Sequence, residues 1–97
     1  MQLLSIQNFA GTANQGYDVA IGEAEMAMTL VEVKPLPVHP YPGMLREPFS
    51  LLFRSQSPVV LPQRMYKLRN AQMGALELFL VPVARDTQGI LYQAVFN

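Results

Sequence analysis

The spacing of apolar positions changes once along the chain, from a helical repeat near the N-terminus to a strand-like alternation. Leu3, Ile6 and Phe9 recur at every third residue, and Gly11 follows them. This spacing predicts a short amphipathic helix that ends near Gly11. Because a helix of about two turns is unstable alone, we expect it to dock as a lid on one end of a sheet.

Alternation of apolar with polar residues predicts strands in most of the remaining chain. The clearest case is "FSLLFRS", in which every second residue is apolar. Helix is an alternative for residues 23–28, because "EAEMAM" has high helix propensity, but the β-branched "TLVEV" that follows favours a strand. The predicted strands are residues 16–22, 25–34, 49–55 and 64–70, and a closing hairpin at 76–97 that turns at "DTQG".

About six short strands with short connections predict an all-β fold with antiparallel pairing. A compact barrel and a two-sheet sandwich both fit this pattern, with the short helix at the N-terminus. The 97 residues are enough for one core, so we expect a single β domain over residues 1–97.

A proline-rich stretch interrupts the strands between residues 35 and 48, where five of the eight prolines lie. Proline removes a backbone donor and fixes φ, so this stretch should be extended and stiff. We expect it to cross from one part of the sheet to another. Stiff segments lose little entropy on docking, which makes Tyr41 and Met44 candidates for an interaction arm. The alternative is a rigid connector packed on its own domain.

The closing hairpin carries apolar residues on both faces. A type I turn followed by a left-handed Gly89 would place Phe79, Val83 and Tyr92 on a core face. The opposite face would carry Leu78, Leu80, Leu91 and Val95. Pro82 lacks an amide hydrogen and must therefore point away from a partner strand or occupy a bulge. In a sandwich the second face would be core, whereas on a single sheet it would be a patch that needs a partner.

The composition of the chain favours the second alternative, an apolar patch that a partner covers. Charged residues make up 14% of the chain, against about 25% in typical soluble domains. The net charge is zero and no basic stripe is present, which argues against nucleic-acid binding. The longest apolar run, residues 78–84, is far shorter than the ~20 residues of a membrane span. With no basic leader at the start, we expect a soluble, cytoplasmic protein.

No group of residues indicates a reaction. Cysteine is absent and His39 is the single histidine, so a thiolate or histidine-based metal site has no ligand set. The serines lack a Gly-x-Ser-x-Gly setting, and the glycines form no phosphate-binding pattern. No carboxylate pair is selected by spacing. We expect no catalytic residue, metal or cofactor, and a protein that is not an enzyme.

Four motifs, "PFSLLF", "LPQRMYKL", "LFLVPV" and "YQAVFN", carry a resemblance over residues 9–97. At these motifs the chain resembles a small, functionally uncharacterised bacterial β-domain family that begins with an apolar helix and ends in Tyr-x-Ala-Val-Phe-Asn. Members of that family are encoded near proteins similar to phage-tail collar and fibre proteins. The resemblance implies a structural or accessory role in a phage-tail-like assembly. The stretch "VHPYPGML" is longer and richer in proline than the family pattern, so the resemblance implies no arm.

Two functions from different classes follow. The first is a non-enzymatic structural or interaction domain that binds a protein partner or itself, with a homo-oligomer expected. Its contact residues would be Tyr41, Met44, Leu78, Leu80, Leu91 and Val95. The alternative is a small β-barrel that binds an apolar ligand, with a pocket lined by Met26, Met28, Phe49, Phe53 and Tyr92.

Overall fold

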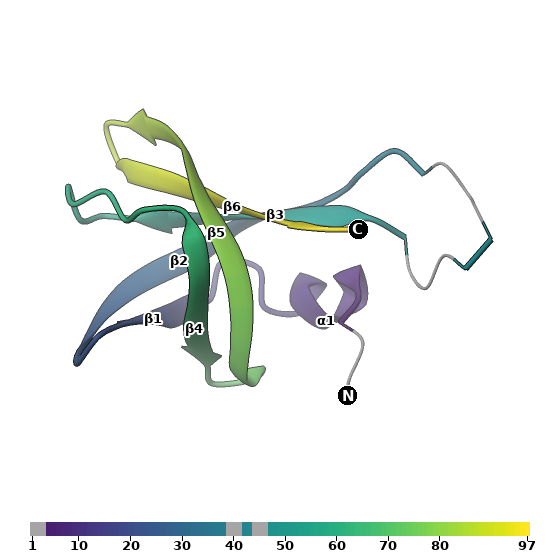
Figure 1. The fold of residues 1–97 in the computed structure, drawn as a ribbon, viewed down its shortest axis with the longest axis horizontal. Helices are drawn as coiled ribbons and strands as arrows, with labels where there is room; N and C mark the ends of the chain where they lie inside the picture. The colour runs from purple at the N-terminus through teal and green to yellow at the C-terminus, as the bar shows by residue number, and fades with distance from the viewer. Residues whose placement is uncertain (1–3, 39–41, 44–46) are drawn as a thin grey trace.

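Six antiparallel strands close into a barrel in the computed structural model, which describes residues 4–38, 42–43 and 47–97 (Figure 1). The order around the barrel is β1-β2-β3-β6-β5-β4, and β4 pairs with β1 to close it. The all-β prediction is confirmed, and the barrel is the correct one of its two forms. The elements are α1 (Ile6–Ala10), β1 (Gly16–Ile21), β2 (Ala24–Pro35), β3 (Phe49–Ser55), β4 (Arg64–Asn70), β5 (Gly74–Asp86) and β6 (Gly89–Phe96).

The strand boundaries follow the alternation in the sequence closely. The predicted bounds of β3 and β4 agree with the structure, and β1 ends one residue before its predicted end. Strand β2 extends one residue beyond its prediction at each end. The helical alternative at residues 23–28 is wrong, because the chain is already in β2 from Ala24. Met28 and Leu30 point into the core from this strand, so its apolar period of two outweighs the helix propensity of its first residues.

The barrel interior is filled by aromatic and branched side chains from all six strands. Tyr17 and Phe53 meet edge to face with 5.2 Å between ring centroids, a favourable arrangement for aromatic pairs. Both are fully buried, as are Leu30, Leu51 and Tyr92. A barrel of this size has room only for its own side chains, so the core occupies the interior.

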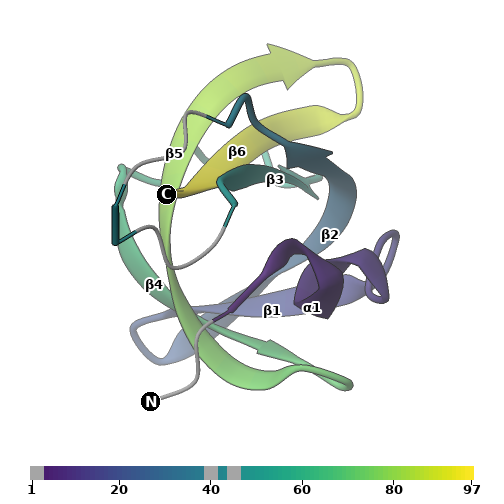
Figure 2. The same ribbon diagram turned by 90° about the vertical axis from the view of Figure 1, so that its right-hand side faces the viewer.

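Helix α1 covers the end of the barrel at which β6 finishes (Figure 2). Phe9 is fully buried, with its ring centroid 5.9 Å from that of Phe49 and 5.5 Å from that of Phe96. Just after the helix, the buried hydroxyl of Thr12 donates to the Phe9 carbonyl at 2.9 Å and lies 2.7 Å from the Tyr17 hydroxyl. The expected lid is therefore present, and a hydrogen-bond relay as well as apolar contact joins it to the barrel wall.

A second plug covers the other end and was not expected from the sequence. Leu61 lies in the connection between β3 and β4, and only 5% of its surface is exposed. Its backbone amide donates to the Tyr92 hydroxyl at 2.9 Å, so the buried phenol has a partner. Residues 56–63, which connect β3 to β4, form no strand.

The proline-rich stretch does not cross the sheet, contrary to expectation. It joins β2 to β3, which are antiparallel neighbours with Pro35 opposite Phe49. The Leu36 amide donates to the Pro48 carbonyl at 3.0 Å just beyond the strand ends. The stretch is thus the long loop of a hairpin, while the crossing connection is the one that carries Leu61. His39, Tyr41 and Met44 lie outside the described residues.

The hairpin of β5 and β6 contains a bulge between Pro82 and Ala84. On the turn side of the bulge, the pairing of Ala84 with Leu91 has the predicted register. On the other side the register shifts by one residue, so that Pro82 faces Tyr92. Because a one-residue shift exchanges the two faces of a strand, the inward residues of β5 are Leu78 and Leu80. Phe79, expected in the core, points outward and is 48% exposed.

Candidate interaction surface

Two of the residues expected to form a contact surface are core residues instead. Leu80 is fully buried and Leu78 is 3% exposed. The register shift at Pro82 turns both inward, and barrel closure covers the face that a flat sheet would leave open. Their assignment to an interaction surface is wrong, because no partner can reach them without unfolding the wall.

The other expected contact residues differ in accessibility. Val95 is exposed over 51% of its surface, and Leu91 is half-buried on the same outer side of β6. Tyr41 and Met44 fall outside the described residues. Val95 therefore remains a direct candidate for contact. Leu91 is opposite Arg54 of β3 in register.

An uncharged outer face runs across β3, β6 and β5. Strand β6 contains no charged residue, and its outward positions are Leu91, Gln93 and Val95. Gln93 is flanked in register by Leu52 of β3 and by Val81 of β5. We call this surface, together with the exposed Phe79 and Val83 of β5 and with Met65 of β4, which is opposite Phe79, the outer apolar face. Its most exposed members are Met65, Phe79, Val83 and Val95.

Sequence reasoning missed Phe79 and Met65 as surface residues. Met65 is 55% exposed and opens the alternation of β4, with Tyr66 and Leu68 inward. Its outward phase could have been read from that alternation. Phe79 could have been placed only by locating the bulge, for which Pro82 was the available signal.

The remaining outer wall carries the charges. Strands β1, β2 and β4 and the first part of β5 expose five charged side chains, namely Asp18, Glu25, Lys67, Arg69 and Glu77. The two sides of the barrel therefore differ in chemistry, with a charged side and an apolar side. A charged side keeps that part of the surface hydrated, whereas contiguous exposed apolar side chains are typical of contact sites.

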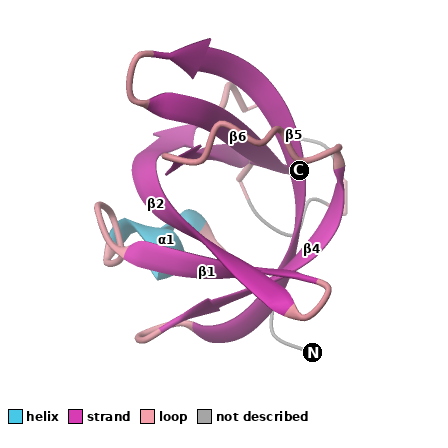
Figure 3. Cartoon of the chain, turned by 90° about the vertical axis from the view of Figure 1, so that its left-hand side faces the viewer, coloured by secondary structure: helices cyan, strands magenta, loops and turns pink. Residues whose placement is uncertain are grey.

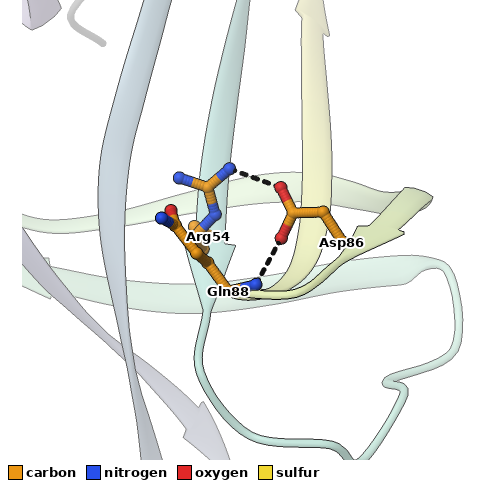
Figure 4. Close-up of polar contacts among 3 residues, drawn as sticks. All are labelled: Arg54, Asp86 and Gln88. Atoms are coloured by element: carbon orange, nitrogen blue, oxygen red, sulfur yellow. Dashed lines mark hydrogen bonds and ion pairs between the residues drawn. The ribbon is translucent and has the colours of Figure 1, made fainter.

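An ion pair marks the edge of the outer apolar face near the hairpin turn (Figure 4). The Arg54 guanidinium of β3 lies 2.8 Å from the Asp86 carboxylate at the end of β5. The Gln88 backbone amide donates to the same carboxylate at 2.8 Å. The pKa of Asp86 is lowered from its ordinary value, first by this amide and then by the hydrogen bond and charge of Arg54, against some opposing desolvation.

Close packing beneath this ion pair depends on a glycine. Gly89 has φ of +134°, and a Cβ added there would lie 1.9 Å from the Ser55 carbonyl oxygen. Beside the turn is an open hollow of about 790 Å³ that includes Arg54, Asp86 and Arg85 in its lining. Since Asp86 already pairs with Arg54, the ion pair rigidifies the turn and supplies no reactive group.

The residues proposed for an apolar ligand pocket pack against one another. Met28, Phe49, Phe53 and Tyr92 are at most 2% exposed and belong to the core, and Met26 is packed at its margin. The interior that a ligand would need is therefore occupied by these side chains. Among the described residues, no three histidine, cysteine, aspartate or glutamate side chains come together in a metal-binding group. No helix in the described part of the chain has the length and apolar content of a membrane span.

The closed six-stranded barrel with its helical lid defines the chain as a small all-β domain. Its sequence matches the family model "Domain of unknown function (DUF6916)" over residues 4–96. The chain belongs to this family, which agrees with the expected small uncharacterised domain. No curated protein and no solved structure matches it.

Proposed function

We propose that this domain is a non-enzymatic structural protein that acts by contact, and that its outer apolar face binds a second copy of the chain. The observation that carries the proposal is the exposure of Phe79 and Val95 on a wall whose central strand has no charge. Two copies could bury this face against each other without removing a charged side chain of β6 from water, which is the costly step in most polar interfaces.

A second copy is favoured over an unlike partner for reasons of charge. The chain has zero net charge, so two copies experience no long-range repulsion. A two-fold interface is self-complementary, and an uncharged face meets that condition without matched ion pairs. The low charged content of the whole chain points in the same direction, because soluble monomers usually carry more charge.

The experiment is sedimentation velocity of the purified chain over a wide concentration range. We expect a defined oligomer for the wild type and dissociation for Val95→Asp and Phe79→Asp, because each places a carboxylate in the apolar contact. Ala75→Asp is the matched control, since Ala75 is exposed on the charged side of the barrel opposite Arg69 and its substitution should leave the oligomer intact. A monomer at every concentration, or equal effects of Val95→Asp and Ala75→Asp, would refute the proposal.

We further propose that the assembly is related to phage tails, with the domain as a subunit or accessory. The support is the resemblance described above, which links such domains to genes for collar-like and fibre-like proteins. The test is quantitative mass spectrometry of tail-like particles purified from the producing cell. A fixed copy number per particle is expected for the wild-type chain. Its absence from intact particles would contradict this role.

A further inference from the structure

The barrel closes through a short seam between β1 and β4, whose extent differs from that of every neighbouring strand pair. The pairing of these strands is limited to Asp18 with Arg69 and Val19 with Leu68. On its other side, β4 is paired with β5 along its whole length, from Arg64 to Asn70. The first four residues of β4, Arg64–Lys67, therefore have no register partner in β1 within the described structure.

The two strands lie side by side at the seam (Figure 3). Beyond it, β1 turns away through Gly22 into β2, with Ile21 opposite Ala24. Strand β4 instead reaches back toward the connection that carries Leu61, where the Tyr66 hydroxyl donates to the Pro62 carbonyl at 2.6 Å. The strands separate because each is held by a different neighbour, and this leaves one edge of β4 open. An open edge with free backbone groups is a template for another strand.

A hollow of about 330 Å³ lies where the strands separate. Its apolar lining includes Ile21 of β1, Leu61 of the connection, and Met65 and Tyr66 of β4. This combination of an open edge and an adjoining apolar hollow is what strand addition requires. The backbone of an extended peptide pairs with the edge, and alternate side chains enter pockets beside it.

The charged residues at the hollow determine which kind of peptide it would bind. Arg64 and Lys67 contribute to its lining, and no acidic residue does. The Arg64 guanidinium lies 5.6 Å from the centre of the Tyr66 ring. Lys67 is opposite Glu77 in register, yet within the described residues no ion pair involves either cation. Two cations without ionic partners beside an apolar hollow are complementary to a carboxylate followed by an apolar side chain.

We propose that the seam binds an extended, acidic and apolar peptide segment of a partner protein, which adds as a strand along Arg64–Lys67. One apolar side chain of the peptide enters the hollow between Ile21, Leu61 and Tyr66, and its carboxylates meet Arg64 and Lys67. This site lies apart from Val95 and Gln93 and shares only Met65 with the outer apolar face. It goes beyond self-association through that face. The domain would thus join copies of itself on one side and hold a partner's strand on another.

The test uses three synthetic peptides and amide chemical shifts of the isotope-labelled chain. The first peptide alternates valine with threonine and contains two glutamates, the second has lysine in place of glutamate, and the third has a central proline in the glutamate sequence. We expect the first to shift the amides of Ile21, Met65 and Tyr66. The lysine peptide should bind about tenfold more weakly, because its ammonium groups would meet Arg64 and Lys67 with repulsion in place of attraction. The proline peptide should lose binding, since proline removes a ladder donor.

Charge reversal separates specific from general electrostatic attraction. The double variant Arg64→Glu with Lys67→Glu should prefer the lysine peptide, while the control Lys34→Glu with Arg85→Glu, which has the same charge change elsewhere, should keep the wild-type preference. Retained amide dispersion verifies the fold of each variant. Shifts confined to β6, an unchanged preference in the seam variant, or no shifts at millimolar peptide would each overturn the proposal. Because oligomer size is measured separately, loss of one proposal leaves the other standing.

Discussion

Adjacent residues of β5 provide a direct test of the barrel, because Leu80 and Phe79 face opposite sides of its wall. Leu80 is fully buried and Phe79 is 48% exposed. Replacing a buried leucine by alanine removes its transfer free energy and leaves a cavity, at a cost of about 2–5 kcal/mol. We therefore expect Leu80→Ala to destabilise the domain by about 3 kcal/mol.

Phe79→Ala should cost much less although it removes a larger side chain. About half of the phenylalanine surface is already in water, and alanine keeps part of the other half covered, so the apolar burial lost is roughly 50 Å². At about 25 cal/mol per Å² this corresponds to about 1 kcal/mol, with no interior cavity. The two variants should therefore differ by about 2 kcal/mol in free energy of unfolding, in the order opposite to side-chain size.

Urea denaturation at low micromolar protein concentration measures the difference in free energy of unfolding, and thermal denaturation measures the corresponding difference in Tm. A change of about 3 kcal/mol should lower Tm by roughly 12–24 °C in a domain of this length, against about 4–8 °C for Phe79→Ala. Repeating the measurement at several concentrations separates fold stability from self-association, which Phe79 also serves in our proposal. Equal losses, or a larger loss for Phe79→Ala, would show that the register does not shift at Pro82 and would refute the placement of both residues.

Two further predictions concern the hairpin turn. Gly89→Ala should destabilise the domain by about 3 kcal/mol or more, because its Cβ would lie 1.9 Å from the Ser55 carbonyl oxygen of β3. Gly22→Ala has open space around it and should cost only about 1 kcal/mol of backbone strain. Equal melting temperatures of the two variants would contradict this prediction. Arg54→Gln should leave the pKa of Asp86 below its ordinary 3.8, since the turn amide is the largest cause of the lowering. The stabilisation from a lowered carboxyl pKa is present above the unfolded value and is lost as pH falls through the folded value. Carboxyl-carbon NMR titration checks this, and a return to 3.8 or above would show that Arg54 alone holds the shift.

Most strands could be predicted from the local alternation of apolar and polar residues, whereas the closure of the barrel and the register of its strands could not. The run "FSLLFRS" predicts β3 from end to end, because Phe49, Leu51 and Phe53 recur at a period of two. The phase of β5 could not be read in the same way, since a bulge adds one residue without changing composition. Pro82 indicated either a bulge or an amide position that points away from a partner strand, and only the pairing with β6 shows a bulge and locates it between Pro82 and Ala84.

The candidate contact surface was harder to predict than the fold because exposure depends on closure. Val95 is exposed, as a contact residue must be, while Leu78 and Leu80, also expected to make contacts, point inward and are buried. A sequence pattern reports which residues share a strand face, but not whether a sheet curls until one face becomes interior. The open edge at Arg64–Lys67 had no sequence signal, because an unpaired edge arises only from the different directions of β1 and β4.

Closure changes the physical argument for assembly without removing it. A barrel of six strands has one interior, so each strand hides one face and shows the other. Most of the surplus apolar surface inferred from the sequence is accounted for by Leu78, Leu80 and their neighbours inside. What closure cannot hide is the outward half of β5 and β6, where alternation should place polar residues on a solitary barrel. Because Phe79 and Val95 occupy those positions, we infer that this wall meets another surface, whereas the charged side of the barrel stays in water.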